Sequence, residues 1–419
     1  MRSTEAQSQP YAEPPRERRH ILFVNHEPYV QHGLERMLRP MRRVWEMDFA
    51  GDARSALERL GEAPFDVVVS DLRMPGMDGQ QFLTEVMRRH PQVVRIILTA
   101  CSEREATLDA MTVSHQLLTK PCDADTLKAT IGRALALRGL LDGETPLKAL
   151  VSRLESLPSL PMLYSQIVEA LQSPNVSVRA IAEIIARDPA MTAKILQLVN
   201  SAYFGLGRHV ADLGRAVTLL GLETIKSLVL TAQVFSQFDP DSLESLSLET
   251  LWSHSACTGA LARKIVESEE GDESQRGEAL TAGLLHDVGQ LLLAVNLPNV
   301  HTKAVKLAHQ EDLQLWQAER QLFGASHGEV GAYLLGLWGL PEGIVEAVAY
   351  HHHPDQAPGF GSKVLTAVHA ANALAHDPSG ASLDWLYLET LGLTGRVEIW
   401  RRLALGIRQA EAAQEEVQA

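Results

Sequence analysis

Short apolar runs alternate with amphipathic segments over the first third of the chain. Apolar runs of strand length separated by helical patterns are typical of parallel α/β sheets. The expected strands are Ile21–Val24, Val44–Phe49, Val67–Ser70, Val94–Leu98 and Gln116–Leu118, and the expected helices include Asp52–Leu60, Gln80–Arg89, Glu103–Met111 and Asp123–Leu137. The pattern predicts an α/β domain over residues 19–138, after a disordered tail over residues 1–18.

Helical periodicity with few strand signals follows a polar linker at residues 139–146. Capping residues mark several helix starts. The expected helices are Val178–Ala186 after Ser177, a helix from Pro189 after Asp188, Leu213 to about Gln237, Trp252–Glu267, and one that opens with the capping box Ser326–Glu329 and runs towards Trp338. We expect an all-helical domain over residues 147–355. A helical extension should follow over residues 356–419, with helices at Lys363–Leu374, Leu386–Leu391 and Val397–Gln409.

One apolar run organises the second half of the chain. Apolar residues recur at helical spacing from Leu280 to Val295, which predicts buried helix. The run contains the adjacent pair His286 and Asp287. A buried imidazole and carboxylate need partners, because an unpaired buried charge is costly. The partners could be a metal ion or other side chains.

Composition narrows the function classes. The chain has 419 residues and a net charge of −14, which argues against nucleic acid or an anionic membrane as the main ligand. Its three cysteines are widely spaced and give neither a disulfide framework nor a zinc motif. No signal peptide or membrane-spanning run is apparent, so we expect a cytoplasmic protein.

Polar residues follow three neighbouring strands of the expected sheet. Asp71, Thr99 and Lys120 come at the ends of the third, fourth and fifth strands. The carboxyl ends of parallel strands share one edge, so these side chains should lie close together. A carboxylate nucleophile with a hydroxyl and an ammonium suits phosphoryl transfer. Taken singly, Asp71 could cap a turn and Lys120 could be a surface charge.

These residues make the region resemble a response regulator receiver domain of flavodoxin-like (βα)5 fold. The resemblance implies phosphorylation at Asp71, with Thr99 and Lys120 in the receiver site. Receivers hold Mg²⁺ through an acidic pair after the first strand, where this chain has Asn25 and His26, followed by Glu27. An imidazole is a poor Mg²⁺ ligand, so Mg²⁺ binding should be weak, although Glu27 could partly restore it. Leu117 also replaces the usual aromatic residue.

Several histidines recur around the His286–Asp287 pair. They are His254, His327, His351 and His352. Imidazoles and a carboxylate on packed helices can form a metal site that hydrolyses phosphate esters. Alternatively, the histidines satisfy one another and backbone carbonyls in a helical core.

The second region resembles the HDOD domain, a relative of the HD phosphohydrolases that commonly lacks demonstrated catalysis. The resemblance rests on segments that include Arg187–Ala190, Val199–Phe204, Gly283–Gly289 and Trp338–Pro341. HD hydrolases carry a late Asp where this chain has Asn372, and the cyclic-di-GMP phosphodiesterase branch carries a Lys where it has Gln290. These departures weigh against hydrolysis and against a transition metal, and they leave the histidines as a vestigial metal set.

The sequence therefore predicts a response regulator whose receiver controls a non-catalytic HDOD domain that binds a downstream signalling protein. The partners would be a sensor histidine kinase or another phosphodonor and that downstream protein, with homodimerisation through the receiver also open. Two alternatives remain at this point: a metal-dependent phosphohydrolase or cyclic-dinucleotide phosphodiesterase of the HD superfamily, and an adaptor that works without phosphorylation.

Overall fold

A computed structural model describes most of both predicted domains. The described residues are 18–100, 110, 113–137, 151, 158–159, 167, 170, 177–200, 210–221, 236–237, 246–359 and 361–418. Residues 1–17 of the tail expected over 1–18, the linker over 139–146 and nearly all of the expected helix Glu103–Met111 lie outside these residues. Among the described residues, no helix is both long enough and apolar enough to cross a membrane.

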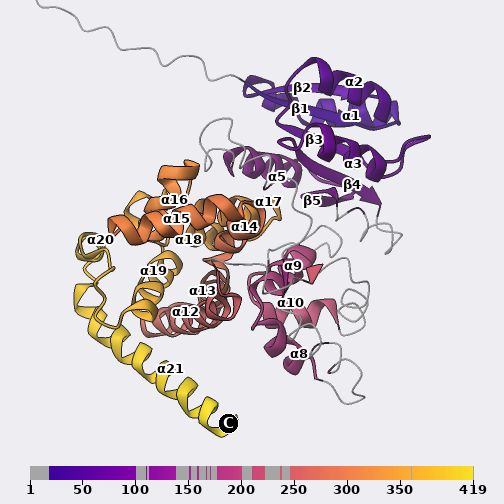
Figure 1. Cartoon of the computed structure of the whole chain (residues 1–419). Helices are drawn as coiled ribbons and strands as arrows, with labels where there is room; N and C mark the ends of the chain where they lie inside the picture. Colours follow the sequence, from indigo (N-terminus) through magenta and orange to yellow (C-terminus); the bar gives the residue numbers. More distant parts are fainter. Residues whose placement is uncertain are drawn as a thin grey trace, which may run out of the picture.

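The first domain is a five-stranded parallel sheet, as predicted. The strands are β1 (Arg19–Val24), β2 (Trp45–Ala50), β3 (Val67–Asp71), β4 (Val94–Ala100) and β5 (Gln116–Lys120), in the order β2-β1-β3-β4-β5. The described helices are α1 (Pro28–Met37), η1 (Arg39–Arg43), α2 (Ala53–Glu62), α3 (Gly79–Arg89) and α5 (Ala124–Leu137). They flank the sheet in Figure 1. The central strand β3 is buried throughout, as expected for a sheet covered on both faces.

The second domain is helical. Its described helices before the tail are α8 (Val178–Ile185), α9 (Pro189–Asn200), α10 (Leu213–Leu220), α12 (Leu248–Ser268), α13 (Glu273–Leu285), α14 (Val288–Asn296), α15 (Pro298–Glu311), α16 (Leu315–Phe323), α17 (His327–Leu337) and α18 (Glu342–Tyr350). The predicted caps are confirmed: Ser177 accepts from the backbone of Ala180, and Ser326 and Glu329 form a capping box.

Two predicted helices of this domain are wrong in extent. The helix from Leu213 ends at Leu220, because Gly221 takes a φ of 74°, a left-handed conformation that favours glycine. Ser236–Gln237, expected inside that helix, instead forms β7, which pairs in parallel with β6 (Pro158–Ser159). The run from Leu280 to Val295 is not one helix but two, because α13 ends at Leu285 and α14 begins at Val288. His286 and Asp287 form the junction.

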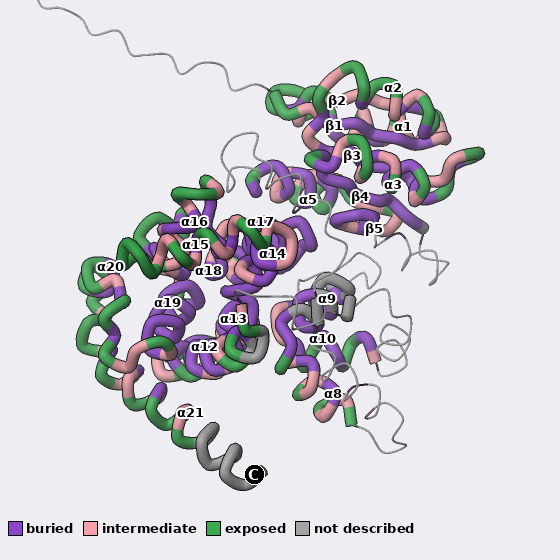
Figure 2. The backbone as a smooth tube through the Cα atoms, in the orientation of Figure 1, coloured by how far each residue is buried: buried purple, intermediate pink, exposed green. Residues whose placement is uncertain are grey.

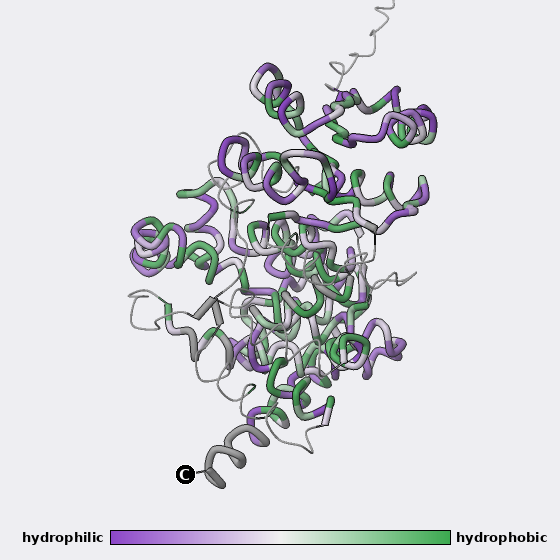
Figure 3. The backbone as a smooth tube through the Cα atoms, turned by 90° about the vertical axis from the view of Figure 1, so that its right-hand side faces the viewer, coloured by the Kyte–Doolittle hydropathy of each residue, from purple (hydrophilic) through white to green (hydrophobic). Residues whose placement is uncertain are grey.

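The C-terminal extension completes the helical domain. It contains η4 (Pro354–Gln356), α19 (Lys363–His376), α20 (Trp385–Thr390), η5 (Thr394–Arg396) and α21 (Val397–Gln418), the last being longer than predicted. Helix α19 and the second half of α13 are almost wholly buried, whereas α20 and α21 show exposed residues (Figure 2). Hydrophobic positions gather in the middle of the molecule and hydrophilic ones on its outer helices (Figure 3).

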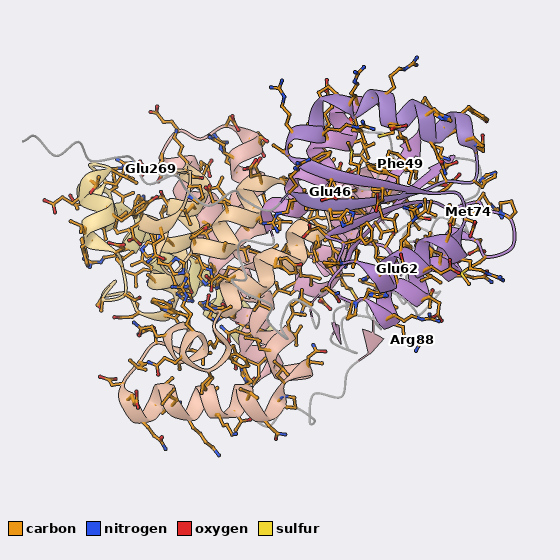
Figure 4. All side chains as sticks on the ribbon, turned by 90° about the horizontal axis from the view of Figure 1, so that it is seen from above. Glu46, Phe49, Glu62, Met74, Arg88 and Glu269 are labelled. Atoms are coloured by element: carbon orange, nitrogen blue, oxygen red, sulfur yellow. The ribbon has the colours of Figure 1, made fainter. Side chains whose placement is uncertain are left out.

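Glu269 attaches the last helix to the domain. Its carboxylate accepts from Arg396 Nε at 2.8 Å and from Trp400 Nε1 at 2.9 Å. Because Glu269 follows α12, these bonds tie α21 to the end of that helix. Figure 4 labels Glu269 beside the yellow C-terminal helices, far from the sheet.

The two domains meet where α5 packs on α17 (Figure 1). A Cβ added at Gly336 of α17 would lie 2.4 Å from a methyl carbon of Leu137, so the absence of a side chain permits this contact. Gln116 Nε2 of β5 also donates to the backbone oxygen of Gly336 at 3.5 Å. The helix that carries His327 at its start thus contacts the α/β domain at its end.

Candidate functional sites

The first candidate site lies at the carboxyl edge of the sheet. Asp71 is the last residue of β3, and Lys120 is the last residue of β5. Lys120 Nζ lies 2.7 Å from Asp71 Oδ2. Thr99 is buried on the intervening strand, one residue beyond Leu98, the register partner of Asp71. The structure therefore brings the carboxylate, hydroxyl and ammonium to neighbouring strand ends, where sequence reasoning placed them.

The loop after β1 supplies the remaining residues of this site. Asn25 Nδ2 donates to Asp71 Oδ2 at 3.2 Å, and Asn25 Oδ1 accepts from the backbone of Glu27 at 2.9 Å. His26 Nδ1 lies 3.7 Å from Asp71 Oδ2. Receivers typically bind Mg²⁺ here, and Mg²⁺ requires oxygen ligands in near-octahedral geometry. The side-chain nitrogen of Asn25 donates to Asp71, and its side-chain oxygen already accepts from the backbone of Glu27, so Asn25 has no oxygen directed at an ion. His26 would supply an imidazole nitrogen instead of an oxygen ligand. This set does not fit Mg²⁺.

The second candidate site is a histidine cluster around Asp287. Asp287 Oδ2 lies 3.2 Å from His286 Nε2, and Asp287 Oδ1 lies 3.1 Å from His327 Nε2. His351 Nε2 is 3.8 Å from Asp287 Oδ1, and His254 Nε2 is 3.9 Å from Asp287 Oδ2. His352 Nε2 reaches His327 Nε2 at 3.0 Å. All six residues predicted for this set therefore come together.

Hydrogen bonds to the local backbone orient the imidazole rings of His286 and His351. His286 Nδ1 and His351 Nδ1 each pair with the backbone oxygen three residues earlier, at 2.8 Å, on Gly283 and Val348. A neutral imidazole that donates from Nδ1 presents a lone pair at Nε2, the form that binds metals. Close helix packing also contributes, since a Cβ at Gly289 would lie 1.9 Å from the backbone oxygen of His327.

Three buried atoms of the cluster lack a hydrogen bond of good geometry. They are His286 Nε2, His351 Nε2 and Asp287 Oδ1. Buried polar atoms without partners are unfavourable, and their convergence provides nitrogen and oxygen donors of the kind that a divalent transition metal uses. The residues present therefore fit such an ion.

Three residues carry the charge within the cluster: the His327 imidazolium and the carboxylates of Asp287 and Glu319. Burial alone would lower the pKa of His327, but the carboxylates of Glu319 and Asp287 outweigh it and raise the pKa to about 10. Burial opposes ionisation of Asp287, yet His286 and His327 hold its pKa well below the usual range. Burial lowers the pKa of His254 to about 4. His327 is thus a buried cation between two carboxylates.

Sequence reasoning missed two residues of this site. Glu319 is fully buried on α16, and its Oε2 lies 2.6 Å from His327 Nδ1. It falls on the apolar face of its helix, four residues after Leu315, which is an unusual place for a carboxylate. The ring of His376 lies against that of His254, with centroids 4.1 Å apart and the ring planes tilted by 32°. It follows Asn372 by one helical turn, and Asn372 Oδ1 lies 2.9 Å from His254 Nε2.

The cluster is closed to solvent. The side chains of His286 and His351 are 0% exposed, that of His327 is 1% exposed and that of Asp287 is 5% exposed. Trp316 of α16 stacks against His352, with ring centroids 5.8 Å apart. In the described part of the chain, the centre of the cluster at Asp287 is therefore nearly closed to a phosphate ester.

Two family models match the chain. A response regulator receiver domain matches residues 21–132, and an HDOD domain matches residues 157–354. Among solved structures, the MmoQ response regulator of Methylococcus capsulatus str. Bath is 26% identical, with a TM-score of 0.47. That match covers 59% of this chain and 93% of the other.

Curated relatives match over parts of their length. An uncharacterized protein of Treponema pallidum (strain Nichols) is 26% identical over 227 residues, which are 54% of this chain and 43% of that protein. The transcriptional regulatory protein ZraR of Escherichia coli O157:H7 is 38% identical over 113 residues, 26% of each protein. The chain therefore spans less than half the length of these two relatives.

Proposed function

Because this chain is a response regulator that joins an N-terminal receiver domain to a C-terminal HDOD domain, we propose that its receiver controls a non-catalytic output domain. The output domain would bind a downstream signalling protein. A receiver implies a phosphodonor kinase, and the carboxylate that accepts the phosphoryl group would be that of Asp71.

The geometry at the sheet edge supports phosphorylation of Asp71. Asp71 Oδ1 accepts a long backbone bond from Arg73, at 3.4 Å, whereas Oδ2 is held by Lys120 and Asn25. One oxygen can therefore attack phosphorus while the other stays oriented. The Lys120 ammonium would balance negative charge on the transferred group. Asn25 and His26 still favour the alternative of an adaptor that works without phosphorylation, since the usual acidic pair is missing.

Helix α17 provides a physical route between the two domains. Its C-terminal end contacts Leu137 and Gln116 of the receiver, and its first residue, His327, lies in the cluster. A change in how α5 packs would therefore bear on α17 directly. Phosphorylation would shift the population between two packings and so expose or hide a partner surface.

The closure of the cluster is the observation that carries the non-catalytic assignment. Hydrolysis requires a substrate phosphate to reach the reacting centre. The four side chains nearest that centre, His286, Asp287, His327 and His351, are at most 5% exposed. Asn372, rather than a carboxylate, also lies against His254, which reduces the negative charge available to hold a metal.

One observation favours a second function, a metal-dependent phosphohydrolase. The converging atoms of His286, His351 and Asp287 would hold a divalent ion, which would supply an activated water. For that function the cluster would have to open, with α16 and its Trp316 moving away from His352.

The decisive experiment compares purified wild-type protein with His286→Ala for metal content and for hydrolysis of nucleotides and cyclic dinucleotides. We expect no hydrolysis above the level of the variant, with or without added Mn²⁺. Near-stoichiometric metal, with hydrolysis that a chelator removes from the wild type, would instead establish the enzyme. Hydrogen exchange of α5 and α17 with and without acetyl phosphate, in wild type and Asp71→Ala, tests control by the receiver.

A further inference from the structure

The receiver site has the donors for a different ion from the one its family uses. We infer that His26, Glu27 and Asp71 bind a divalent transition-metal ion of the Zn²⁺, Co²⁺ and Ni²⁺ class in preference to Mg²⁺. Nothing in this inference depends on whether the HDOD domain is catalytic.

The three donors already lie together. One ligand atom from each of His26, Glu27 and Asp71 falls within 4.8 Å of the others. His26 Nδ1 is 3.7 Å from Asp71 Oδ2, and His26 Nε2 is 3.8 Å from Glu27 Oε1. Two ligands that each lie about 2.1 Å from one ion are roughly 3 to 3.5 Å apart at octahedral to tetrahedral angles. Since one ring offers a single nitrogen to an ion, His26 would bind through Nδ1 on the side of Asp71, and Glu27, whose ligand atom lies within 4.8 Å of the others, would turn to complete the site.

His26 has an unused donor inside this site. Its Nδ1 is buried and makes no hydrogen bond, although the ring stands between two carboxylates. The distances to Asp71 and Glu27 exceed those of hydrogen bonds. An ion between the ring and a carboxylate would satisfy both groups at once.

The backbone holds the loop in place. Asn25 N donates to Ala50 O at 3.1 Å, and Gln31 Nε2 donates to the backbone oxygens of both Asn25 and Ala50, at 2.6 and 2.9 Å. Helix α1 begins directly afterwards at Pro28, whose fixed φ suits a first helical position. The positions of His26 and Glu27 are thus set before any ion binds, which lowers the entropy lost on binding.

Ligand chemistry then decides the metal. Imidazole nitrogen binds the later first-row ions well, whereas Mg²⁺ prefers carboxylate, carbonyl and water oxygens. Asn25 contributes no oxygen, because its Oδ1 accepts from the backbone of Glu27 and its Nδ2 points at Asp71. Three protein donors leave at least one coordination position open, as in zinc sites that bind exogenous ligands. Phosphoryl oxygens near Asp71 are the ligands that this position would face.

The test uses the full chain in four forms: wild type, His26→Ala, His26→Asp and the control His32→Ala. His32 lies on the exposed face of α1, with its Nδ1 against Pro28 O, outside the site. Equilibrium dialysis against Zn²⁺ or Co²⁺, followed by elemental analysis, gives the bound equivalents. Any ion held by the HDOD histidines is present equally in all four forms, so the differences isolate the receiver.

We expect wild type and His32→Ala to bind one more equivalent of Zn²⁺ than His26→Ala, with millimolar Mg²⁺ unable to displace it. His26→Asp should lose Zn²⁺ affinity on the order of 100-fold and gain affinity for Mg²⁺. The ligand-field absorption of bound Co²⁺ should change in both His26 variants, and circular dichroism verifies that they are folded. Equal Zn²⁺ stoichiometry in wild type and His26→Ala, equal Zn²⁺ affinity in wild type and His26→Asp, or displacement of Zn²⁺ by equimolar Mg²⁺ would overturn the inference.

Discussion

The two candidate sites each centre on one carboxylate, yet its surroundings differ. Asp71 lies at a sheet edge against Lys120 and His26, whose side chains are 27% and 32% exposed. Asp287 lies among histidine rings, the most exposed of those it pairs with being His254 at 13%. The Asp71 and Asp287 side chains are themselves almost equally buried, at 6% and 5% exposed, so the two sites differ in how open their neighbours are. Movement of the partly exposed His26 and Lys120 side chains would admit a second molecule to Asp71, whereas Asp287 would respond to changes in the packing of the helices around it.

This difference suits the receiver to receiving a signal and the helical domain to responding to it. A site reached from solvent suits an input, such as transfer from a phosphodonor. A closed cluster on the helix that contacts the receiver suits a mechanical element, because packed interiors have few discrete arrangements. Changes at Asp71 should therefore alter chemistry with little effect on folding, and changes around Asp287 should do the reverse.

The largest effect should come from Asp71→Ala. We expect complete loss of acid-stable, hydroxylamine-sensitive phosphate incorporated from acetyl phosphate, measured by intact-protein mass spectrometry. Asp78→Asn is the matched control, because Asp78 is a half-buried carboxylate in the following loop that caps α3, and Asn caps nearly as well. If wild type and Asp71→Ala incorporate the same amount, the phosphoacceptor lies elsewhere.

The pH dependence of unfolding should be dominated by the helical domain. Burial lowers the pKa of His254 to about 4, so between roughly pH 6.5 and pH 4 the unfolded chain binds a proton that the folded domain does not. The stability contribution is therefore complete above about pH 6.5 and declines as pH falls, by up to about 3 kcal/mol for this group. Burial also lowers the pKa of His351, His352 and His369.

His327 should act in the opposite direction. Its pKa is raised to about 10, so its contribution is complete below about pH 6.5 and is lost as pH rises towards 10. Thermal unfolding followed by tryptophan fluorescence should show maximal stability near neutral pH. Tryptophan fluorescence reports mainly on unfolding of the helical domain, because only Trp45 of the six tryptophans lies in the receiver. His254→Gln should flatten the acid limb, and an unchanged limb would assign it to other groups.

Glu319→Gln should destabilise the helical domain by about 2 to 3 kcal/mol. The carboxylate is fully buried and accepts from both the backbone and the ring of His327, at 2.8 and 2.6 Å. Removing its charge leaves the imidazolium with one carboxylate partner, and breaking a buried pair is strongly unfavourable. The measurement is urea unfolding at pH 7.

Glu329→Gln is the control for that variant. Glu329 belongs to the capping box of α17 and pairs with Arg320, but it is only partly buried. Because glutamine can complete a capping box, the change should cost about 1 kcal/mol or less. Equal effects of the two variants would mean that the Glu319–His327 pair is no stronger than a surface ion pair.

Sequence patterns predicted the receiver site better than the cluster for a physical reason. Parallel strands end at a common edge, so the order of strands alone places Asp71 near Lys120. Helices impose no such register. The break at His286–Asp287 could not be seen in the apolar pattern, because Leu284 and Leu285 before it and Val288 after it are all buried although they lie on two helices.

Partners from distant helices were equally hard to predict. His254 and Asn372 are 118 residues apart, and only the packing of α12 on α19 brings them to 2.9 Å. The family resemblance, rather than periodicity, pointed to Asn372. Glu319 had a local signal, a carboxylate on an apolar helical face, but its partner His327 depends on how α16 folds back on α17. Which residues of distant helices become partners is therefore determined by tertiary packing, which the local sequence pattern does not specify.

The sharpest test of how the two sites communicate should come from Gly336→Leu. A Cβ at this position would already lie 2.4 and 2.5 Å from the two methyl carbons of Leu137. A larger side chain must push α5 off α17, with an overpacking penalty of about 1 to 3 kcal/mol if the domains stay docked. Separation of the domains avoids that penalty, so we expect a larger radius of gyration in small-angle X-ray scattering.

The double variant Leu137→Ala/Gly336→Leu restores space at the same contact. It should return the scattering to that of the wild type, because the leucine at position 336 then fills the volume that Leu137 vacated. Phosphate incorporation at Asp71 should be the same in all three proteins, since the sheet edge is not altered. If Gly336→Leu leaves scattering and hydrogen exchange of α17 unchanged, the packing of α5 on α17 does not connect Asp71 to Asp287.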